Sequence, residues 1–230
     1  MNNLFKWNNK EGSKAYGSGS AAKGFTLAEV LMTLGLVGVI AVVTMTTLIP
    51  NIQNAELKTT FKTVYSDVAQ VTSKIMTDNG NSLKDVFPYS NTMRDKYKEY
   101  LNTLKSCDKG QSFGNCWHNS GSFKYLNGNP ITGWGDKAGI VLNNGTLLRF
   151  QVDSSNCTAL AGTVPYCGFI SIDVNGWQSP NVLGKDIYHI WVQENGIKPR
   201  GTKGDTYENT CNTTSVYAGT GCAAKVLMGQ

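Results

Sequence analysis

The feature that most constrains this chain is one uninterrupted apolar segment, residues 25–49, whose single charged residue is Glu29. As an α-helix, at about 1.5 Å per residue, this segment would be about 37 Å long and would cross a hydrocarbon core of about 30 Å. No other segment of the 230-residue chain combines this length and composition. A helix that is apolar on every side must be covered by lipid or by other protein. The segment therefore predicts a single membrane-spanning helix.

The helix is expected to continue beyond the apolar segment with a different character. Pro50 removes one helical hydrogen bond and clashes with the preceding turn, so a kink or break is expected there. Beyond it, apolar residues recur at steps of three or four, which places them on one helical face. These residues are Leu57, Phe61, Val64, Val68, Val71 and Ile75. The pattern predicts one long helix over residues 25–79, with an amphipathic second half and a stop at Asn79-Gly80.

The first 24 residues have the opposite composition. They are rich in Gly, Ser and Asn, and they show no apolar periodicity, so this segment alone is predicted to be disordered. They carry four lysines against one glutamate, out of a formal net charge of +5 for the chain. A basic segment before a membrane span favours retention on the cytoplasmic side. The remainder is close to neutral and gives no reason to expect a nucleic-acid surface.

The six cysteines fall into three close pairs. The even count, the close spacing and the absence of a C-x-x-C motif favour disulfides over a zinc site, which would also need more than the two histidines present. Free structural thiols are the alternative. Disulfides would place this part of the chain in an oxidising compartment. The expected local pairs are Cys107–Cys116, Cys157–Cys167 and Cys211–Cys222.

Residues 81–230 are expected to form one globular head. A short helix is predicted first, and strands with turn signals such as Asn143-Asn144-Gly145 follow it. We expect an α+β fold, in which the amphipathic half of the long helix lies across an antiparallel sheet of about four strands with disulfide-tied loops. The predicted helix covers residues 91–105, and the predicted strands cover residues 138–142, 146–152, 169–174 and 187–192.

Residues 23–29, Lys-Gly-Phe-Thr-Leu-Ala-Glu, resemble the prepilin cleavage and methylation motif, in which Gly-Phe-Thr-Leu is followed by any residue and then Glu. A basic residue precedes the small Gly24, Phe25 follows it, Glu29 stands five residues into the mature chain, and an apolar span follows. With these features together, residues 1 to about 80 resemble the subunits of type IV pili and of type II secretion pseudopili.

This resemblance implies a processing route. A prepilin peptidase would cut between Gly24 and Phe25 on the cytoplasmic face and methylate the new Phe25 amine, whereas an ordinary signal peptide is cut after its apolar stretch. Residues 1–24 would be the cleaved leader, and residues 25–49 would stay as the anchor. The alternative is a signal-anchored protein that is never cleaved.

The resemblance also implies partners and a location. The protein would sit in the bacterial inner membrane with its head outside the cytoplasm, and it would then enter a filament in the periplasm or at the cell surface. Its partners would be the peptidase, an inner-membrane assembly platform with its ATPase, membrane lipid before assembly, and copies of itself or other pilins. In this family Glu29 would pair with the Phe25 amine of an adjacent subunit.

Two details of the head bear a resemblance to the same family. Some major pseudopilins bind calcium in a head loop, and Asp173, Asn175 and Asp186 offer oxygen ligands of the kind that calcium prefers. Asp-x-Asn-Gly is equally a turn signature, which leaves both interpretations open. The pair Cys211–Cys222 resembles the disulfide-closed loop near the end of many pilins.

The sequence contains none of the common catalytic motifs. Neither G-x-S-x-G, H-E-x-x-H nor a phosphate-binding glycine loop is present, so we expect a structural subunit and not an enzyme. His118 and His189 are expected to be structural or surface residues. Asp205 and Glu208 are expected to be solvated charges in a Thr/Gly-rich loop.

The rival hypothesis is a minor pilin that acts as an adhesin or DNA receptor. It would require an exposed basic or aromatic surface on the head, and three basic residues are too few to favour nucleic acid. The sequence leaves open whether the filament is a surface pilus or a secretion pseudopilus, and whether the subunit is major or minor. The residues that could form a binding surface are Lys198, Arg200 and Lys203, with Trp117, Trp134 and Trp177.

Overall fold

A computed structural model describes residues 24–228 of the chain, and the expected leader therefore lies outside the described residues except for Gly24. The chain forms two compact units, Met1–Leu48 and Ile49–Gln230, which are described separately below. The helices are α1 (Leu27–Asp78), α2 (Ser90–Lys98) and α3 (Cys222–Leu227). The strands are β1 (Thr103–Cys107), β2 (Ala138–Leu142), β3 (Leu147–Val152), β4 (Ala159–Ala161), β5 (Val164–Tyr166), β6 (Gly168–Asp173), β7 (Ile187–Gln193) and β8 (Gly196–Pro199).

Helix α1 agrees with the predicted long helix. Within the first unit, Leu27–Met45 is long and apolar enough to cross a membrane, and none of it is buried by the protein itself. The backbone is helical without interruption across Pro50, so the break that was one expected outcome there is absent.

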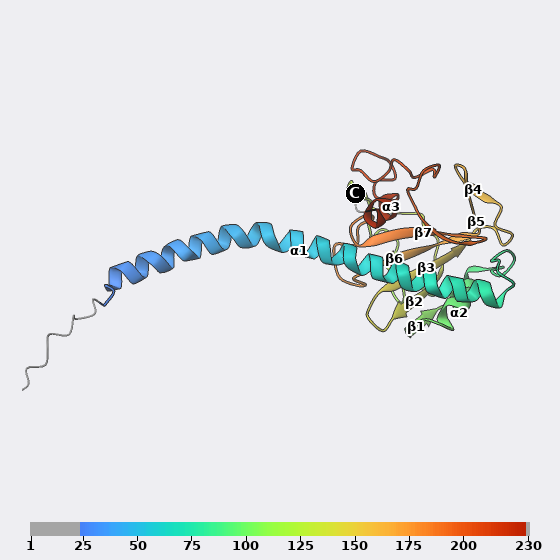
Figure 1. The fold of residues 1–230 in the computed structure, drawn as a ribbon, viewed down its shortest axis with the longest axis horizontal. Helices are drawn as coiled ribbons and strands as arrows, with labels where there is room; N and C mark the ends of the chain where they lie inside the picture. Colours follow the sequence, from blue (N-terminus) through green and yellow to red (C-terminus); the bar gives the residue numbers. More distant parts are fainter. Residues whose placement is uncertain (1–23, 229–230) are drawn as a thin grey trace, which may run out of the picture. The chain divides into compact units, whose positions relative to one another are not determined.

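The head contains a six-stranded antiparallel sheet in the order β1-β2-β3-β6-β7-β8 (Figure 1). Each strand pairs with the next one in the chain, except that a small two-stranded hairpin, β4-β5, is inserted between β3 and β6. The four predicted strands correspond to β2, β3, β6 and β7, the consecutive inner strands of this sheet. The two edge strands and the hairpin were not predicted.

The predicted helix over residues 91–105 is too long. Helix α2 ends at Lys98, and Thr103–Cys107 instead forms the edge strand β1. The apolar residues of the 91–105 segment indicate one continuous helical face. Pairing of this segment with β2, which includes Cys107 opposite Gly139, overrides that local pattern.

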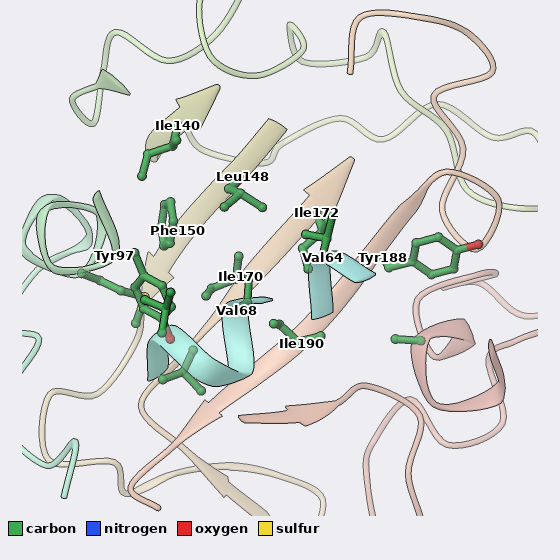
Figure 2. Packing of buried hydrophobic residues seen from close by; sticks show 14 of the residues in the cluster. Val64, Val68, Tyr97, Ile140, Leu148, Phe150, Ile170, Ile172, Tyr188 and Ile190 are labelled. Atoms are coloured by element: carbon green, nitrogen blue, oxygen red, sulfur yellow. The ribbon is translucent and has the colours of Figure 1, made fainter. Parts of the chain in front are cut away.

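The apolar stripe of α1 packs on one face of the sheet (Figure 2). Phe61, Val64, Val68 and Ile75 are each at most 1% exposed, and the ring of Phe61 stacks on that of Tyr188 with 4.1 Å between centroids. Because side chains alternate along a strand, every second residue faces the helix. The facing residues include Ile140, Leu148, Phe150, Ile170, Ile172 and Ile190.

The opposite face of the sheet is covered as well. A second cluster of buried side chains from the loop after β1, including Trp117, Phe123 and Ile131, packs on Val141 and Leu147. Strands β2 and β6 are consequently buried along their whole length. The sheet therefore lies between the helix and a layer of loops.

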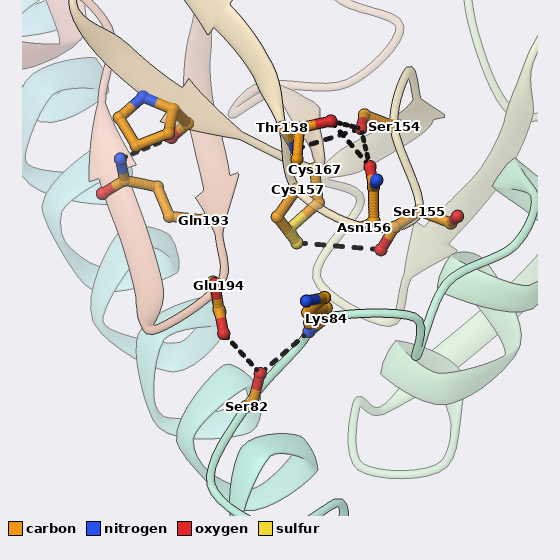
Figure 3. Close-up of a disulfide and its surroundings, with 11 residues drawn as sticks. Ser82, Lys84, Ser154, Ser155, Asn156, Cys157, Thr158, Cys167, Gln193 and Glu194 are labelled. Atoms are coloured by element: carbon orange, nitrogen blue, oxygen red, sulfur yellow. Dashed lines mark hydrogen bonds between the residues drawn. A yellow bond between two sulfur atoms is a disulfide. The ribbon is translucent and has the colours of Figure 1, made fainter.

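Three disulfides tie these loops, and they join the expected local pairs: Cys107–Cys116, Cys157–Cys167 and Cys211–Cys222. The sequence separations are only 9, 10 and 11 residues. Figure 3 shows the second bridge, which closes the base of the β4-β5 insertion. There the Asp153 and Ser154 amides both donate to the Cys167 carbonyl, so the segment after β3 is hydrogen-bonded to the segment before β6.

The packing of α1 on the sheet predicts a large effect of shortening Phe61. Phe61→Ala removes a fully buried ring and leaves a cavity against Tyr188, so the free energy of unfolding should fall by about 3–5 kcal/mol. Urea unfolding of the detergent-solubilised chain, followed by tryptophan fluorescence, measures this. The control is Lys62→Ala on the exposed side of the same helix, expected to change stability by less than about 0.5 kcal/mol. Equal effects of the two substitutions would contradict the packing described.

Candidate functional site

The amino end of α1 is closed by two neighbouring polar side chains. The Glu29 carboxylate accepts hydrogen bonds through Oε2 from the Thr26 amide at 2.9 Å and from the Thr26 hydroxyl at 3.0 Å. In return, the Glu29 amide donates to Thr26 Oγ1 at 3.2 Å. This reciprocal arrangement is a capping box, which satisfies amide donors that a helix start leaves without partners. Its sequence signal is the local pattern Thr-x-x-Glu before an apolar run, which occurs at residues 26–29.

The residues of the expected cleavage site precede this cap. Gly24 and Phe25 lie outside the helix, and Phe25 is 86% exposed. A Cβ added to Gly24 would meet nothing within 4 Å. Nothing in the fold of the described residues therefore requires a glycine at this position, whereas a protease that binds the exposed peptide could require one.

The three candidate calcium ligands do lie together, because β6 and β7 pair with Asp173 opposite Ile187, next to Asp186. Their carboxylate oxygens already have partners from the protein. Asp186 accepts from the Asn181 and Val182 amides at 2.7 Å each, and Asp173 accepts from the Asn175 amide at 3.3 Å. Within residues 24–228, no group of three His, Cys, Asp or Glu side chains is placed to hold a metal ion. The contacts are those of the turn alternative, and calcium binding stays an untested prediction.

The other oxygen of Asp173 contacts His118. His118 Nε2 lies 2.8 Å from Asp173 Oδ2, and both side chains are buried. Burial raises the pKa of Asp173 to about 6. The pair fastens the loop after β1 to the end of β6, and Trp177 packs edge-on against the His118 ring. His118 is therefore a buried residue that joins two elements of the head.

His189 is also buried, in the middle of β7, and neither of its ring nitrogens has a hydrogen-bond partner among the described residues. Burial, reinforced by the neighbouring Arg200 and Arg149 charges, lowers its pKa well below the usual value. The ring is consequently neutral near neutral pH.

The expectation of a solvated Asp205 is wrong. Its side chain is buried and accepts hydrogen bonds from Trp191 Nε1 and from the Gly201 amide, both at 2.8 Å. Glu208 is exposed, as expected, and accepts from the Gly204 amide. A Thr/Gly-rich sequence gave no indication that one carboxylate would organise the loop from inside.

The expected basic surface of the rival hypothesis is not a single exposed cluster. Lys203 is exposed and Lys198 is half-buried, but Arg200 is only 4% exposed. Its guanidinium carbon lies 3.7 Å from the ring centroid of Trp191 and 4.0 Å from that of Phe169. Of the three tryptophans considered, Trp117 is buried, Trp134 is partly buried and Trp177 is 49% exposed.

No protein-family model matches the chain, and neither a curated protein nor a solved structure matches it. The functional interpretation therefore depends on the residues and their geometry alone.

The buried His118–Asp173 pair predicts a coupled effect on stability. His118→Ala leaves a buried carboxylate without its side-chain partner and should lower the free energy of unfolding at neutral pH by about 3 kcal/mol. Asp173→Asn keeps the shape without the charge. The loss in the double variant should therefore be clearly smaller than the sum of the two single losses in a double-mutant cycle.

The same carboxylate predicts a pH dependence. Its pKa in the folded protein, about 6, is higher than that of an unfolded aspartate near 3.9. Stability from this group is therefore fully present below about pH 4 and is lost as the pH rises through 6. Unfolding measured across this range should show a shallower decline for Asp173→Asn than for the unmodified chain. Parallel pH profiles of the two proteins would show that the pKa of Asp173 is not raised. Additive losses in the double-mutant cycle would show that His118 and Asp173 are not coupled.

Proposed function

We propose that this protein is a prepilin: a membrane-held subunit that a prepilin peptidase trims and an assembly machine polymerises into a type IV pilus or type II secretion filament. The observation that carries the proposal is the exposed Gly24-Phe25 peptide immediately before a capped, apolar helix of spanning length. The uncleaved signal anchor explains the span, but it needs neither a small residue before Phe25 nor an acid at position 29.

The geometry of Glu29 supports a role in assembly. Insertion of a carboxylate within a membrane helix costs about 2.5–3.5 kcal/mol on insertion scales. A cationic partner would offset this cost. Thr26 supplies hydrogen bonds to Oε2, and Oε1 accepts none from the described residues. Cleavage before Phe25 would create an amine that remains protonated after a single methylation. In our proposal this amine, on an adjacent subunit, pairs with Glu29 and fixes the axial stagger of one helix against the next.

The head supports the proposed location. Three disulfides require an oxidising compartment, which a bacterial inner-membrane protein meets on its outer side. The proposed partners are the peptidase, an assembly platform with its ATPase, and other subunits. Catalysis is assigned to those partners, and this chain acts as substrate and building block. The proposal covers both filament types and both major and minor subunits.

Processing predicts a defined mature terminus. Filament protein should begin at N-methylated Phe25, which intact-mass measurement of sheared filaments reads directly. Gly24→Asp should leave a full-length precursor outside the filament, because a peptidase that needs a small residue would reject the bulky charge. Gly24→Ala is the matched control and should still be cleaved, since an added methyl group meets nothing in this chain. Filament protein that keeps its leader, or that starts elsewhere without a methyl group, would refute the proposal.

Assembly predicts that the charge of Glu29, and not its capping role, is required. In strains carrying only the variant, Glu29→Val and Glu29→Gln should both be cleaved and held in the membrane, but should enter filaments poorly or not at all. Thr26→Ala removes the hydroxyl half of the capping box and keeps the carboxylate, so its filament yield should be close to normal.

Sheared filament protein, quantified against membrane-held subunit, gives the result for all three variants. A normal yield from Glu29→Val would show that charge pairing does not drive assembly. Equal losses from Thr26→Ala and Glu29→Gln would assign the effect to the helix cap instead.

A further inference from the structure

A row of polar side chains crosses the sheet on the face opposite α1, where apolar residues are the norm. Arg149 on β3 stands opposite Ser171 on β6, and Ser171 stands opposite His189 on β7. The row ends at Arg200, just after β8, whose amide donates to the His189 carbonyl. All four side chains are at most 4% exposed.

Most of the polar atoms in this row have no hydrogen-bond partner among the described residues. Arg149 uses only Nη2, which donates to the Gly135 carbonyl at 2.8 Å and to Gln151 Oε1 at 3.4 Å. Buried polar atoms are normally paired, so several unpaired ones side by side indicate a ligand or ordered water. The unpaired buried atoms are Nε and Nη1 of Arg149, Oγ of Ser171, Nδ1 and Nε2 of His189, and Nε of Arg200.

A cavity of about 370 Å³ opens over both ends of this row. Its volume is in the range of small-molecule sites. Both arginines line it, and its walls are unusually aromatic. The aromatic lining residues are Tyr125, Trp134, Tyr166, Phe169, Trp191, Tyr207 and Tyr217.

The cavity has an excess of positive charge. Lys137, Arg149 and Arg200 line it, and Asp153 is the one acidic lining residue. Neither arginine forms an ion pair among residues 24–228; the nearby Asp205 is occupied by Trp191 and backbone amides. Burial lowers the pKa of Arg149 and of Arg200 to about 10, so both remain charged at neutral pH. Aromatic faces contact both guanidinium groups, that of Trp134 for Arg149 and those of Phe169 and Trp191 for Arg200, and an entering anion would add the counter-charge that both lack.

We propose that this cavity, lined by Arg149, Arg200 and Lys137 and walled by aromatic rings, is a binding site for a carboxylate-bearing sugar. A guanidinium fork matches a planar carboxylate through two parallel hydrogen bonds. Flat aromatic faces such as those of Trp134 and Tyr217 pack against the apolar face of a sugar ring. Gln151, Asp153 and Thr220 at the lining can bond to hydroxyl groups.

Other anions fit less well. A nucleic-acid strand needs cationic groups spaced along a groove that follows its phosphates, whereas here the three cationic side chains line one cavity. Asp153 would repel a polyphosphate but can accept hydrogen bonds from sugar hydroxyls. The proposal concerns the head alone, so its failure would leave the proposed filament function unaffected, and the converse also holds.

The test is calorimetric titration of the full chain in detergent micelles with trigalacturonate at neutral pH and low ionic strength. The matched probe is the methyl ester of the same trisaccharide, which keeps the rings and removes the charge. We expect saturable binding of the acid, and binding of the ester weaker by about tenfold or more. Arg200→Gln should weaken acid binding by about tenfold or more, whereas Lys198→Gln, which removes a nearby charge that does not line the cavity, should not.

Further variants and ligands complete the test. If Arg200→Gln fails to fold, Lys137→Gln at the same cavity gives the charge test, and Tyr217→Ala, whose ring is 51% exposed, tests the aromatic wall. Inorganic phosphate and a short single-stranded DNA are titrated in parallel. Absence of saturable acid binding, equal binding of acid and ester, or tighter binding of phosphate or DNA would each overturn the proposal. So would equal effects of the cavity variants and Lys198→Gln.

Discussion

The head depends on the contact between the amphipathic half of α1 and the sheet. Phe61, Val64 and Val68 supply the apolar layer that covers Ile170 and Ile190, and no other helix of the described chain could replace this area, since α2 and α3 are short. Burial of apolar surface is the main force that stabilises such a fold. The residues that hold the head together therefore belong to the same helix whose first half is apolar enough for a membrane.

The other face of the sheet has a different character. Facing the helix, the strands present mostly apolar side chains; facing the loops, they present Arg149, Ser171, Asp173 and His189. A polar row inside a core is unfavourable unless its groups are bonded. Asp173 is satisfied by His118, and the other three keep atoms without partners. Of those three, only Arg149 lines the cavity, so it is the one that a ligand there could contact, whereas Ser171 and His189 are outside the lining.

The sequence predicted the long helix, the four inner strands and the local cysteine pairs, because each depends on a short-range pattern of apolar period, turn residues or spacing. The sequence did not predict the features that depend on contacts between distant segments. Thr103–Cys107 became a strand because β2 offers a partner, and Asp205 is buried because Trp191 lies beside it. Arg149 and His189 occupy alternate positions of their strands, where the local pattern does not distinguish a solvent face from a face covered by loops, and both are buried. At the amino end of α1 the capping-box signal was fully local and could have been found.

The short span of each disulfide affects the order in which the head can be made. No bridge encloses more than about ten residues, so closing each loop restricts the chain little and needs no contact between distant strands. A chain threaded outward through a membrane would expose the first pair, then the second, then the third. Each pair could oxidise before the next cysteine emerged. In such a chain, crossed bonds among the three pairs would be disfavoured kinetically, and the head would have little need of a disulfide isomerase.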